Sequence, residues 1–372
     1  MKYYIIAGER SGDLHAGNLC GALTKAAPDI SIRGVGGEQM AGAGVNLFMH
    51  YKAISFMGFA EVLLNLHKIS RALTNVKKDL DAYAPDAVIL VDFAGFNMKI
   101  ARYAQRKGIK VFYYISPKVW AWNQKRAYKI KALVDHLFVI LPFEKQFFEQ
   151  FGYHNVDYVG NPLLDSIRSY KPTPDFRNRF SKDKPLVAVL AGSRQQEVSA
   201  MGNKLQAIAE KLPNVQFVVA AVDNLEDKHY QAFRGPNIQL LKNDTYNLLS
   251  VADASITTSG TATLETALFR CPQIVVYKTS SFTYMIAKSL IKIPFISLVN
   301  LISDKEIVKE LIQKEFNTDR VIEELTKILP GGIQREKILK DYQELASLMG
   351  SPGASEKTAG LIVEYSKRKF YP

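Results

Sequence analysis

Short apolar runs alternate with longer amphipathic stretches along almost the whole chain. Apolar runs of strand length, bounded by glycine, proline and small polar residues, predict buried β-strands, and the stretches between them have helical spacing. Strands that alternate with helices in this way indicate parallel sheets with helices on both faces, which is the α/β class. The predicted strands are residues 2–7, 30–35, 87–91, 111–115, 137–141, 186–190, 216–221, 238–241, 254–258 and 273–277.

The alternation runs in two series, which are separated by a polar, proline-flanked segment at residues 169–184. A chain of 372 residues is longer than one ordinary core supports, so its length also favours two domains. We expect a first domain over residues 1–168 and a second over residues 169–345. The charged helical pattern near the C-terminus, which includes residues 346–372, is expected to cross back and pack on the first domain.

The turn Ser259-Gly260-Thr261 lies between the predicted strand 254–258 and a helix-forming run. The amides at the start of a helix and its positive dipole end suit a phosphate group, and glycine lets a ligand approach the backbone closely. Glu265, about one turn into the helix, can accept hydrogen bonds from the two hydroxyls of a ribose. The same residues also fit an ordinary turn with a capping serine and a solvated glutamate.

Candidate chemistry follows other predicted strands too, at the sheet edge where open α/β folds bind ligands. Asp92 follows the third predicted strand, and residues 8–13 form a turn before a helix predicted at residues 15–26. In the second series, Gly192 opens a turn in which Arg194 can neutralise a phosphate through its planar fork. The glycines after the second strand do not complete the dinucleotide-binding fingerprint, so a nicotinamide cofactor is disfavoured.

Three further features each have a simple structural interpretation. Residues 54–78 combine a broad apolar face with a basic flank, which fits a membrane interface or an acyl chain but also a helix packed on the sheet. Trp120 and Trp122 lie among cationic residues, where they can stack on a sugar or lipid headgroup or anchor their loop to the core. The pair Asp79 and Asp81 lacks further metal ligands and is expected to be solvated surface.

Lysine and arginine outnumber aspartate and glutamate by 48 to 36, so the formal net charge is +12. This excess favours an anionic partner: nucleic acid, a nucleotide substrate or an acidic membrane surface. No nucleic-acid-binding motif is found and the basic residues are spread out, which argues against nucleic acid. Two isolated cysteines fit a reducing compartment such as the cytosol, and neither a signal peptide nor a membrane-spanning run is recognised.

Taken together, several motifs resemble the lipid-A-disaccharide synthase family, whose members are glycosyltransferases with the two-domain GT-B fold. The tryptophan motif and the first motif are the most specific of them, and the motifs run through nearly the whole chain in order. They occupy residues 8–13, 57–62, 116–122 with 124–126, 141–144, 192–194 with 197–198, 259–262 with 264–265, and 298–301.

The resemblance implies an α/β fold of two facing Rossmann-like domains with parallel sheets and a reaction between two acylated sugars. The family transfers 2,3-diacylglucosamine from UDP onto 2,3-diacylglucosamine 1-phosphate (lipid X), which forms a β-1,6 bond with inversion and releases UDP. By this resemblance the chain is a hexosyltransferase of lipid A and lipopolysaccharide biosynthesis that needs neither a cofactor nor a metal. Its partners are UDP-2,3-diacylglucosamine, lipid X and the anionic inner face of the inner membrane, to which the cytoplasmic enzyme is peripherally bound. No nucleic acid partner is expected, and the resemblance is compatible with a homodimer.

Residue roles carry over by similarity to the matching positions. In the catalytic set, Asp92 is expected to be the general base that takes the proton from the acceptor 6-hydroxyl, with Glu9 and Ser11 on the acceptor side. Gly95 stands where the family commonly has a second acidic residue, so Asp92 would act without it. The residues expected to hold UDP are Arg194, Ser259, Gly260, Thr261 and Glu265, with Asn300 near the diphosphate or donor sugar. The residues expected to contact membrane or acyl chains are Phe56, Met57, Phe59, Val62, Leu63 and Leu66.

Two other functions fit parts of the sequence. A UDP-sugar epimerase, or another GT-B transferase with a soluble acceptor, would explain the UDP-binding turns but not the apolar, basic helix. A lipid- or nucleotide-binding module without chemistry would bind its ligand without releasing UDP. Acyl-chain length and oligomeric state are not encoded in any motif.

Overall fold

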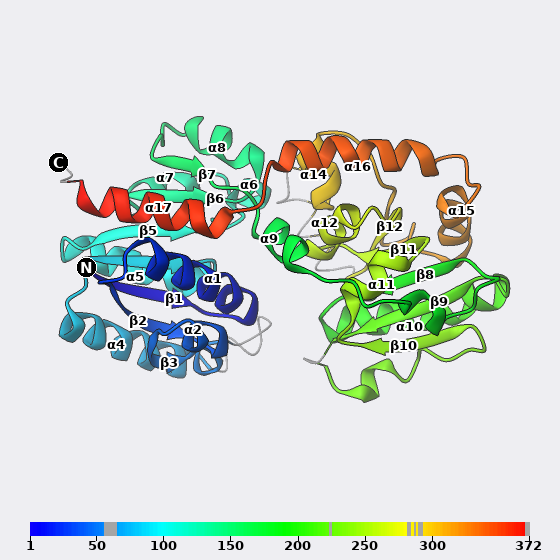
Figure 1. The fold of residues 1–372 in the computed structure, drawn as a ribbon, viewed down its shortest axis with the longest axis horizontal. Coiled ribbons are helices and arrows are strands. Elements are labelled where there is room, and N and C mark those ends of the chain that lie inside the picture. Colours follow the sequence, from blue (N-terminus) through cyan, green and yellow to red (C-terminus); the bar gives the residue numbers. More distant parts are fainter. Residues whose placement is uncertain (56–64, 223–224, 281–283, 286–287, 289–292, 369–372) are drawn as a thin grey trace. The chain divides into compact units, whose positions relative to one another are not determined.

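The computed structural model describes residues 1–55, 65–222, 225–280, 284–285, 288 and 293–368. The chain divides into two compact units, which we call unit 1 (Met1–Asp165 and Ser351–Pro372) and unit 2 (Ser166–Gly350). Figure 1 shows the elements of both units. Among the described residues, each unit is built around one sheet in which all strand pairs are parallel.

Unit 1 is built on a seven-stranded sheet with the order β3-β2-β1-β4-β5-β6-β7. Its central strands β1 and β4 pair in register, with Ile5 opposite Ile89. The strand order reverses between β1 and β4, and such a switch point is where open α/β sheets bind ligands. The strands are β1 Lys2–Ala7, β2 Ser31–Gly36, β3 Asn46–His50, β4 Ala87–Val91, β5 Lys110–Tyr114, β6 His136–Val139 and β7 Val156–Tyr158.

Helices cover this sheet, and the last helix of the chain, α17 (Ala354–Lys367), packs against α1 (Arg10–Ala26). The side chain of Tyr3 donates from Oη to Ser366 Oγ over 3.0 Å, and Lys110 Nζ donates to the carbonyl oxygens of Tyr365 and Ser366 over 3.0 Å each. The C-terminal helix is therefore an integral part of unit 1. The other helices of this unit are α2 Glu38–Gly42, the 3-10 turn η1 Tyr51–Ala53, α4 Leu66–Tyr83, α5 Ala94–Arg106, α6 Val119–Trp122, α7 Arg126–Lys131 and α8 Pro142–Glu149, and α9 Pro162–Ser169 spans the boundary between the units.

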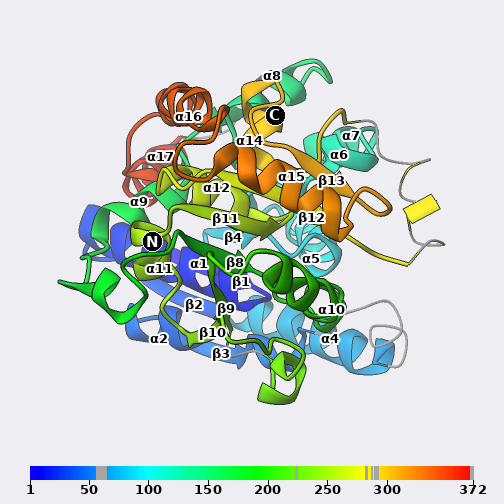
Figure 2. The same ribbon diagram turned by 90° about the vertical axis from the view of Figure 1, so that its right-hand side faces the viewer.

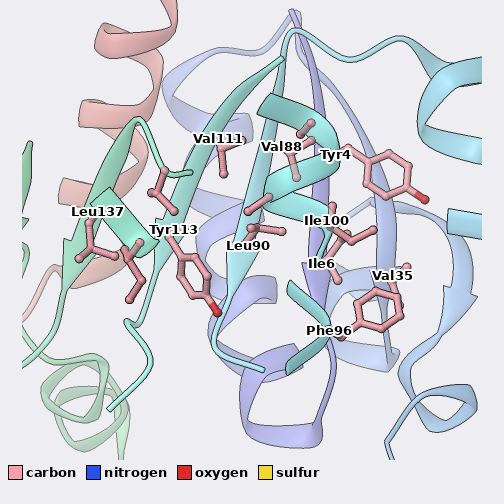
Figure 3. Close-up of a cluster of buried hydrophobic side chains, with 14 of the residues drawn as sticks. Tyr4, Ile6, Val35, Val88, Leu90, Phe96, Ile100, Val111, Tyr113 and Leu137 are labelled. Atoms are coloured by element: carbon pink, nitrogen blue, oxygen red, sulfur yellow. The ribbon is translucent and has the colours of Figure 1, made fainter. Parts of the chain in front are cut away.

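The two faces of the sheet in unit 1 bury two separate sets of side chains, because successive residues of a strand point to opposite faces. On one face, Leu90 packs in the same cluster as Ile100 of α5 (Figure 3). On the other face, Ile89 packs in a cluster with Leu19 of α1 and Ile362 of α17. Burial of one such aliphatic side chain contributes roughly 1.5–3 kcal/mol to the free energy of folding. The strands that carry the site residues are therefore held in place by core packing on both faces of the sheet.

Unit 2 is built on a six-stranded sheet with the order β10-β9-β8-β11-β12-β13. The helices α12, α14 and α16 contact one another on one face of this sheet, while α10 lies on the other face and contacts α15 (Figures 1 and 2). The strands are β8 Leu186–Leu190, β9 Gln216–Ala221, β10 Ile238–Lys242, β11 Ala254–Thr258, β12 Gln273–Tyr277 and β13 Glu310–Ile312. The helices are η2 Phe176–Arg179, α10 Gln195–Lys211, η3 Asp227–Tyr230, α11 Thr245–Val251, α12 Thr261–Leu268, α14 Leu298–Ser303, α15 Thr318–Ile328 and α16 Arg335–Met349.

The predicted α/β class with parallel sheets is confirmed, and every predicted strand is found within two residues of its predicted bounds. The strands that the sequence did not predict are β3, β7 and β13, which all lie at sheet edges. An edge strand has one neighbour and less apolar surface to bury, so its pattern is weak. The turn predicted over residues 8–13 is shorter than expected, because α1 begins at Arg10.

The expectation that Asp79 is solvated surface is wrong. Its side chain is only 11% exposed, forms an ion pair with Arg33 at 2.8 Å, and accepts a hydrogen bond from Tyr4 Oη over 2.8 Å. A buried carboxylate needs such partners to offset its lost hydration. Asp79 therefore joins α4 to β1 and β2, whereas Asp81 is 42% exposed and pairs with Lys107 at the surface.

Candidate active site

Asp92 stands directly after β4, at the carboxyl edge of the sheet of unit 1. Its backbone has a φ of +46°, in the left-handed region that residues other than glycine rarely adopt. Three bonds hold this conformation: the Asp92 amide donates to the Tyr114 carbonyl over 3.1 Å, and Asn97 Nδ2 (2.8 Å) and Tyr113 Oη donate to the Asp92 carbonyl. Strained residues that the surroundings hold in this way cluster at functional sites, so the geometry favours a functional role for this side chain.

The surroundings of Asp92 also change its acidity. Burial raises the pKa of Asp92 to about 6; the carboxylate of Glu9 adds to this rise, while the positive charge of Lys118 opposes it. A carboxyl group with a pKa near neutrality is mostly ionised at pH 7 and can still hold a proton during a reaction. Asp92 therefore has the acidity expected of a general base.

The loop between β1 and α1 lies against the loop after β4. An ideal Cβ on Gly8 would lie 2.0 Å from Cδ1 of Phe93, so only glycine leaves room for that ring. Glu9 is the N-cap residue of α1 and accepts from Ser11 Oγ over 2.8 Å. The structure thus brings Glu9 and Asp92 together and links Ser11 to them through Glu9, with Ser11 exposed in the first turn of the helix.

The glycine-rich segment after β2 is bound by the protein itself. Asp13, buried in α1, accepts hydrogen bonds from the backbone amides of Gly37 and Gln39, the latter over 3.0 Å. An ideal Cβ on Gly37 would lie 2.8 Å from Oδ2 of Asp13 and 2.5 Å from the Tyr51 ring. These glycines therefore permit close packing of protein groups and do not form a free phosphate cradle.

The two tryptophans of the chain have different surroundings. Trp120 is buried and donates from Nε1 to Glu144 Oε1 over 3.1 Å. Trp122 is 45% exposed, and Cζ of Arg126 lies 4.3 Å from the centroid of its ring. Glu144 is itself fully buried and also accepts from Ser116 Oγ over 2.7 Å. Burial raises the pKa of Glu144, and its hydrogen bonds oppose the rise. Trp120 therefore anchors its loop to the core, and Trp122 is the tryptophan that a ligand can reach.

The turn after β8 presents the Arg194 side chain to solvent. Gly192 has a φ of +99°, and an ideal Cβ there would lie 2.3 Å from Oε2 of Glu197. The same carboxylate oxygen accepts the amides of Ser193 and Arg194 over 3.2 and 3.3 Å. These amides are therefore occupied by Glu197. The guanidinium of Arg194 pairs with Glu197 Oε1 through Nη1 at 3.4 Å, but it is 71% exposed and has further N–H donors for an anion.

The turn after β11 keeps its backbone open. Gly260 is the N-cap residue of α12, and no described atom lies within 4 Å of an ideal Cβ built there. The amides in the first turn of a helix have no partner within the helix, so the start of α12 retains donors for an anion. The Ser259 hydroxyl donates to the Ile296 carbonyl over 2.9 Å, which fixes the turn. Gly260 and Thr261 are exposed at its tip.

Glu265 lies one turn into α12, as expected, and is partly buried beside Tyr246. Its Oε1 accepts from Tyr246 Oη over 3.0 Å, and the Tyr246 ring packs against Phe269 with centroids 4.9 Å apart. Burial raises the pKa of Glu265, while the bond from Tyr246 lowers it. A carboxylate in this position can accept from ribose hydroxyls only if the ligand reaches it beside Tyr246.

Comparison with known proteins identifies the family. The model of a family described as lipid-A-disaccharide synthetase matches residues 3–363. The lipid-A-disaccharide synthase of Syntrophus aciditrophicus is 37% identical and that of Geobacter sulfurreducens 35% identical, and each match covers 98% of this chain and 97% of the relative. The chain belongs to the lipid-A-disaccharide synthase family. It is therefore a glycosyltransferase of lipid A biosynthesis, and the alternative of a binding module without chemistry is wrong.

Solved structures confirm the fold of this synthase family member. UDP-GlcNAc 2-epimerase from Neisseria meningitidis, bound to UDP-GlcNAc, aligns with a TM-score of 0.61 and 14% identity, covering 98% of this chain and 99% of its own. The UGT2 of Phytolacca americana, complexed with UDP-2fluoro-glucose and pterostilbene, aligns with a TM-score of 0.65 and 13% identity over 99% and 100% of the two chains. At such identities the likeness shows only the fold, which is of the GT-B type.

The side chain of Asn300 is bound inside unit 2. Its side chain is fully buried in α14, where Nδ2 donates to the Val308 carbonyl and to Glu310 Oε1 over 2.9 Å each. Its Oδ1 accepts the amides of Ile307 and Val308 over 2.8 and 3.0 Å. The amide group is therefore fully used inside unit 2, and the position of Asn300 near the diphosphate or donor sugar stays a prediction.

The expected membrane-contact residues fall mostly outside the described residues. Phe56, Met57, Phe59, Val62 and Leu63 all lie there. Leu66, at the start of α4, is described and is 51% exposed. Farther along α4, Ala72, Val76 and Leu80 are buried on the sheet, so this part of the predicted apolar face belongs to the core. None of the helices in the described ranges is long and apolar enough to cross a membrane.

The sequence analysis assigned no role to three residues that shape these sites, although the first two lie in the family motifs: Glu144, Glu197 and Asn97. Each is a polar side chain that bonds to a loop at a strand end. The first two stand at the third position of helices α8 and α10, where a glutamate commonly returns a hydrogen bond to the N-cap residue, so the capping pattern was the available signal.

Within the described ranges, no group of three or more His, Cys, Asp or Glu side chains could hold a metal ion.

Proposed function

We propose that this enzyme transfers 2,3-diacylglucosamine from UDP to 2,3-diacylglucosamine 1-phosphate (lipid X) and forms the β-1,6-linked lipid A disaccharide. The acceptor 6-hydroxyl attacks the anomeric carbon of the donor while the bond from that carbon to UDP breaks. A single displacement of this kind inverts the configuration at the anomeric carbon. Membership in the family supports the reaction class, and the residues below support the division of roles.

Asp92 carries the proposal, since it is a partly buried carboxylate at the end of β4 with a pKa of about 6. As general base it takes the proton of the 6-hydroxyl as the new bond forms, and the proton is later released to water. Glu9 lies beside it, raises its basicity, and positions Ser11 through their 2.8 Å hydrogen bond. Gly95, exposed in the first turn of α5, supplies no second carboxylate here.

The donor diphosphate is held in unit 2. The exposed guanidinium of Arg194 and the amides at the start of α12, at Gly260 and Thr261, would stabilise the charge that develops on UDP as it leaves. Ser259 fixes that turn through its bond to Ile296, and Glu265 would accept from the ribose beside Tyr246. No contact of the Asn300 side chain with the donor is included.

The acylated substrates imply work at a lipid surface. The net charge of +12 suits the anionic inner face of the inner membrane, and we place the enzyme in the cytoplasm, peripherally bound there. Leu66, exposed at the start of α4, would belong to the surface that contacts lipid or acyl chains. A homodimer is compatible with this role.

The test is a product assay with synthetic substrates. Purified enzyme is incubated with UDP-2,3-diacylglucosamine and lipid X, UDP release is followed, and the lipid product is analysed by mass spectrometry. We expect one disaccharide per UDP released. The coupling constant of its anomeric proton, measured by NMR, is expected to report the β configuration. Matched reactions contain the unacylated analogues of both sugars and are expected to give little product.

Three results would contradict the proposal. UDP release without disaccharide would identify a hydrolase, and equal turnover of acylated and unacylated sugars would favour a transferase with a soluble acceptor. An epimerase would instead change the donor sugar in the absence of lipid X.

A further inference from the structure

A hollow of about 650 Å³ opens on unit 2, between the first half of α10 and the segment that follows β12. The residues that α10 contributes recur at helical spacing, so they form one stripe along that helix. The lining residues are Gln195, Gln196, Ser199, Ala200, Asn203, Lys204, Lys278, Thr279 and Ser280.

The lining of the hollow is positively charged. Its described lining residues include Lys204 and Lys278 and no carboxylate. In the described part of the chain neither lysine forms an ion pair; the Lys204 ammonium lies 5.2 Å from the Phe316 ring. Burial lowers the pKa of Lys204, and the positive charge of Lys278 lowers it further. An anion between the two ammonium groups would relieve their repulsion.

The hollow adjoins the candidate donor site. Gln195 and the residues after it continue directly from Arg194, so the hollow begins at the end of that turn. Lys278 follows β12, and the Val276 carbonyl near the end of that strand accepts the Ser259 amide over 3.1 Å. The hollow therefore begins next to the Arg194 turn, and the Ser259 turn bonds to the strand that leads into Lys278, at the carboxyl edge of the sheet.

We propose that this hollow is an anion-binding subsite in which Lys204 and Lys278 together hold a phosphate group. Neutral donors from Gln195, Asn203 and Thr279 would complete its hydrogen bonds. Two sources carry this chemistry. The position beside Arg194 favours the diphosphate of the donor, a form that rests on the proposed function. The headgroup of an anionic phospholipid is the other source, and that form does not depend on the donor.

The experiment compares Lys204→Gln, Lys278→Gln and the double variant with Lys211→Gln. Lys211 is a matched control because it lies on the same helix, is 57% exposed and pairs with Asp319 away from the hollow. Binding of UDP is measured by calorimetry, with inorganic phosphate as competitor. Binding to phosphatidylcholine vesicles with and without phosphatidylglycerol is measured by flotation. Melting temperatures and the variants Lys204→Arg and Lys278→Arg separate loss of charge from loss of folding.

If the diphosphate occupies the hollow, each Lys→Gln change weakens UDP binding by roughly three- to tenfold, as expected for a partly exposed charge-assisted hydrogen bond. The arginine variants and Lys211→Gln then bind UDP as the unmodified enzyme does. If a headgroup occupies it, UDP binding is unchanged and flotation with phosphatidylglycerol falls. Unchanged UDP binding and unchanged flotation in the double variant would overturn the inference. Failure of the unmodified enzyme to bind UDP would instead contradict the donor site of the proposed function, and the flotation result would still decide the headgroup form.

Discussion

Asp92 in unit 1 is held by its surroundings from several sides, whereas Arg194 and the Gly260 turn in unit 2 stand open to solvent. Both regions follow buried strands of parallel sheets and occupy the same edge of their units. In unit 1, Asn97 of α5 and Tyr113 of β5 donate hydrogen bonds to the backbone carbonyl of Asp92. In unit 2, the guanidinium of Arg194 is 71% exposed although it pairs with Glu197, and Gly260 and Thr261 at the start of α12 are exposed as well.

The difference follows from the task proposed for each region. A general base must have a fixed position and a pKa near neutrality, and burial supplies both at some loss of stability. Groups that bind a diphosphate must be accessible to it from solvent, and the binding energy of the ligand can order exposed groups. If this comparison is right, changes in unit 1 alter turnover or folding, and changes in unit 2 alter nucleotide affinity.

The largest expected effect is that of Asp92→Asn, which removes the base but keeps the size of the side chain. We expect kcat to fall by roughly 10²- to 10⁴-fold, the usual contribution of general base catalysis, with UDP affinity nearly unchanged. Steady-state kinetics and calorimetry measure the two quantities. Asp86→Asn is the matched control, because exposed Asp86 precedes the same strand at its opposite end and bonds to the Lys2 amide. Near-normal turnover of Asp92→Asn would remove this residue from the mechanism.

Arg194→Ala is expected to have the next largest effect, and on binding instead of turnover. Loss of a charge-assisted hydrogen bond to phosphate weakens UDP binding by roughly tenfold, which appears as a raised Kd in calorimetry. The control is Arg234→Ala, which removes an exposed arginine of the same unit from the loop before β10. Equal UDP affinity for both variants would show that Arg194 does not bind the donor.

Two glycine substitutions sharpen the comparison on the level of packing. Gly8→Ala forces a methyl group against the Phe93 ring and should destabilise the enzyme by roughly 1–3 kcal/mol. Gly260→Ala meets no described atom and should change the free energy of unfolding by less than about 0.5 kcal/mol while weakening UDP binding. Denaturant unfolding and calorimetry check the pair. A stability loss as large in Gly260→Ala as in Gly8→Ala would contradict the difference between the two loops.

The last prediction concerns the pH dependence of stability. The pKa of Asp92 is raised to about 6 in the folded protein, so the folded state binds this proton more tightly than the unfolded state. Its contribution to stability therefore falls as pH rises from about 4 to about 6 and stays low above that. Asp92→Asn lacks this loss and should be more stable than the unmodified enzyme by roughly 1–3 kcal/mol at pH 7, but not at pH 4. The check is denaturant unfolding of both proteins at pH 4 and pH 7. If Asp92→Asn and the unmodified enzyme differ in free energy of unfolding by the same amount at both pH values, folding does not raise the pKa of Asp92.

Much of this architecture can be predicted from the sequence because central strands are long, apolar and bounded by turn residues. The edge strands β7 and β13 have three residues each and too little pattern to be recognised. The strand ends that carry Asp92, Arg194 and Ser259 follow from the same pattern, since a polar residue after a buried strand marks the edge of a sheet.

What a side chain does at such an edge depends on contacts that no local pattern contains. Asn300 lies in a family motif, yet its amide group is used by the backbone at residues 307–308 and by Glu310. Asp79 has the local pattern of a surface residue, but tertiary packing brings Arg33 and Tyr4 to it. The raised pKa of Asp92 likewise arises from burial between loops that are far apart in the sequence.

The dependence of kcat/KM on pH tests the central claim most directly, because it reports the ionisation of essential groups in the free enzyme. With UDP-2,3-diacylglucosamine and lipid X, we predict that kcat/KM rises with pH through an apparent pKa of about 6, and that Asp92→Asn abolishes this limb along with most of the activity. An acid limb near the ordinary carboxyl pKa of about 4, or one that persists unchanged in Asp92→Asn, would contradict the account.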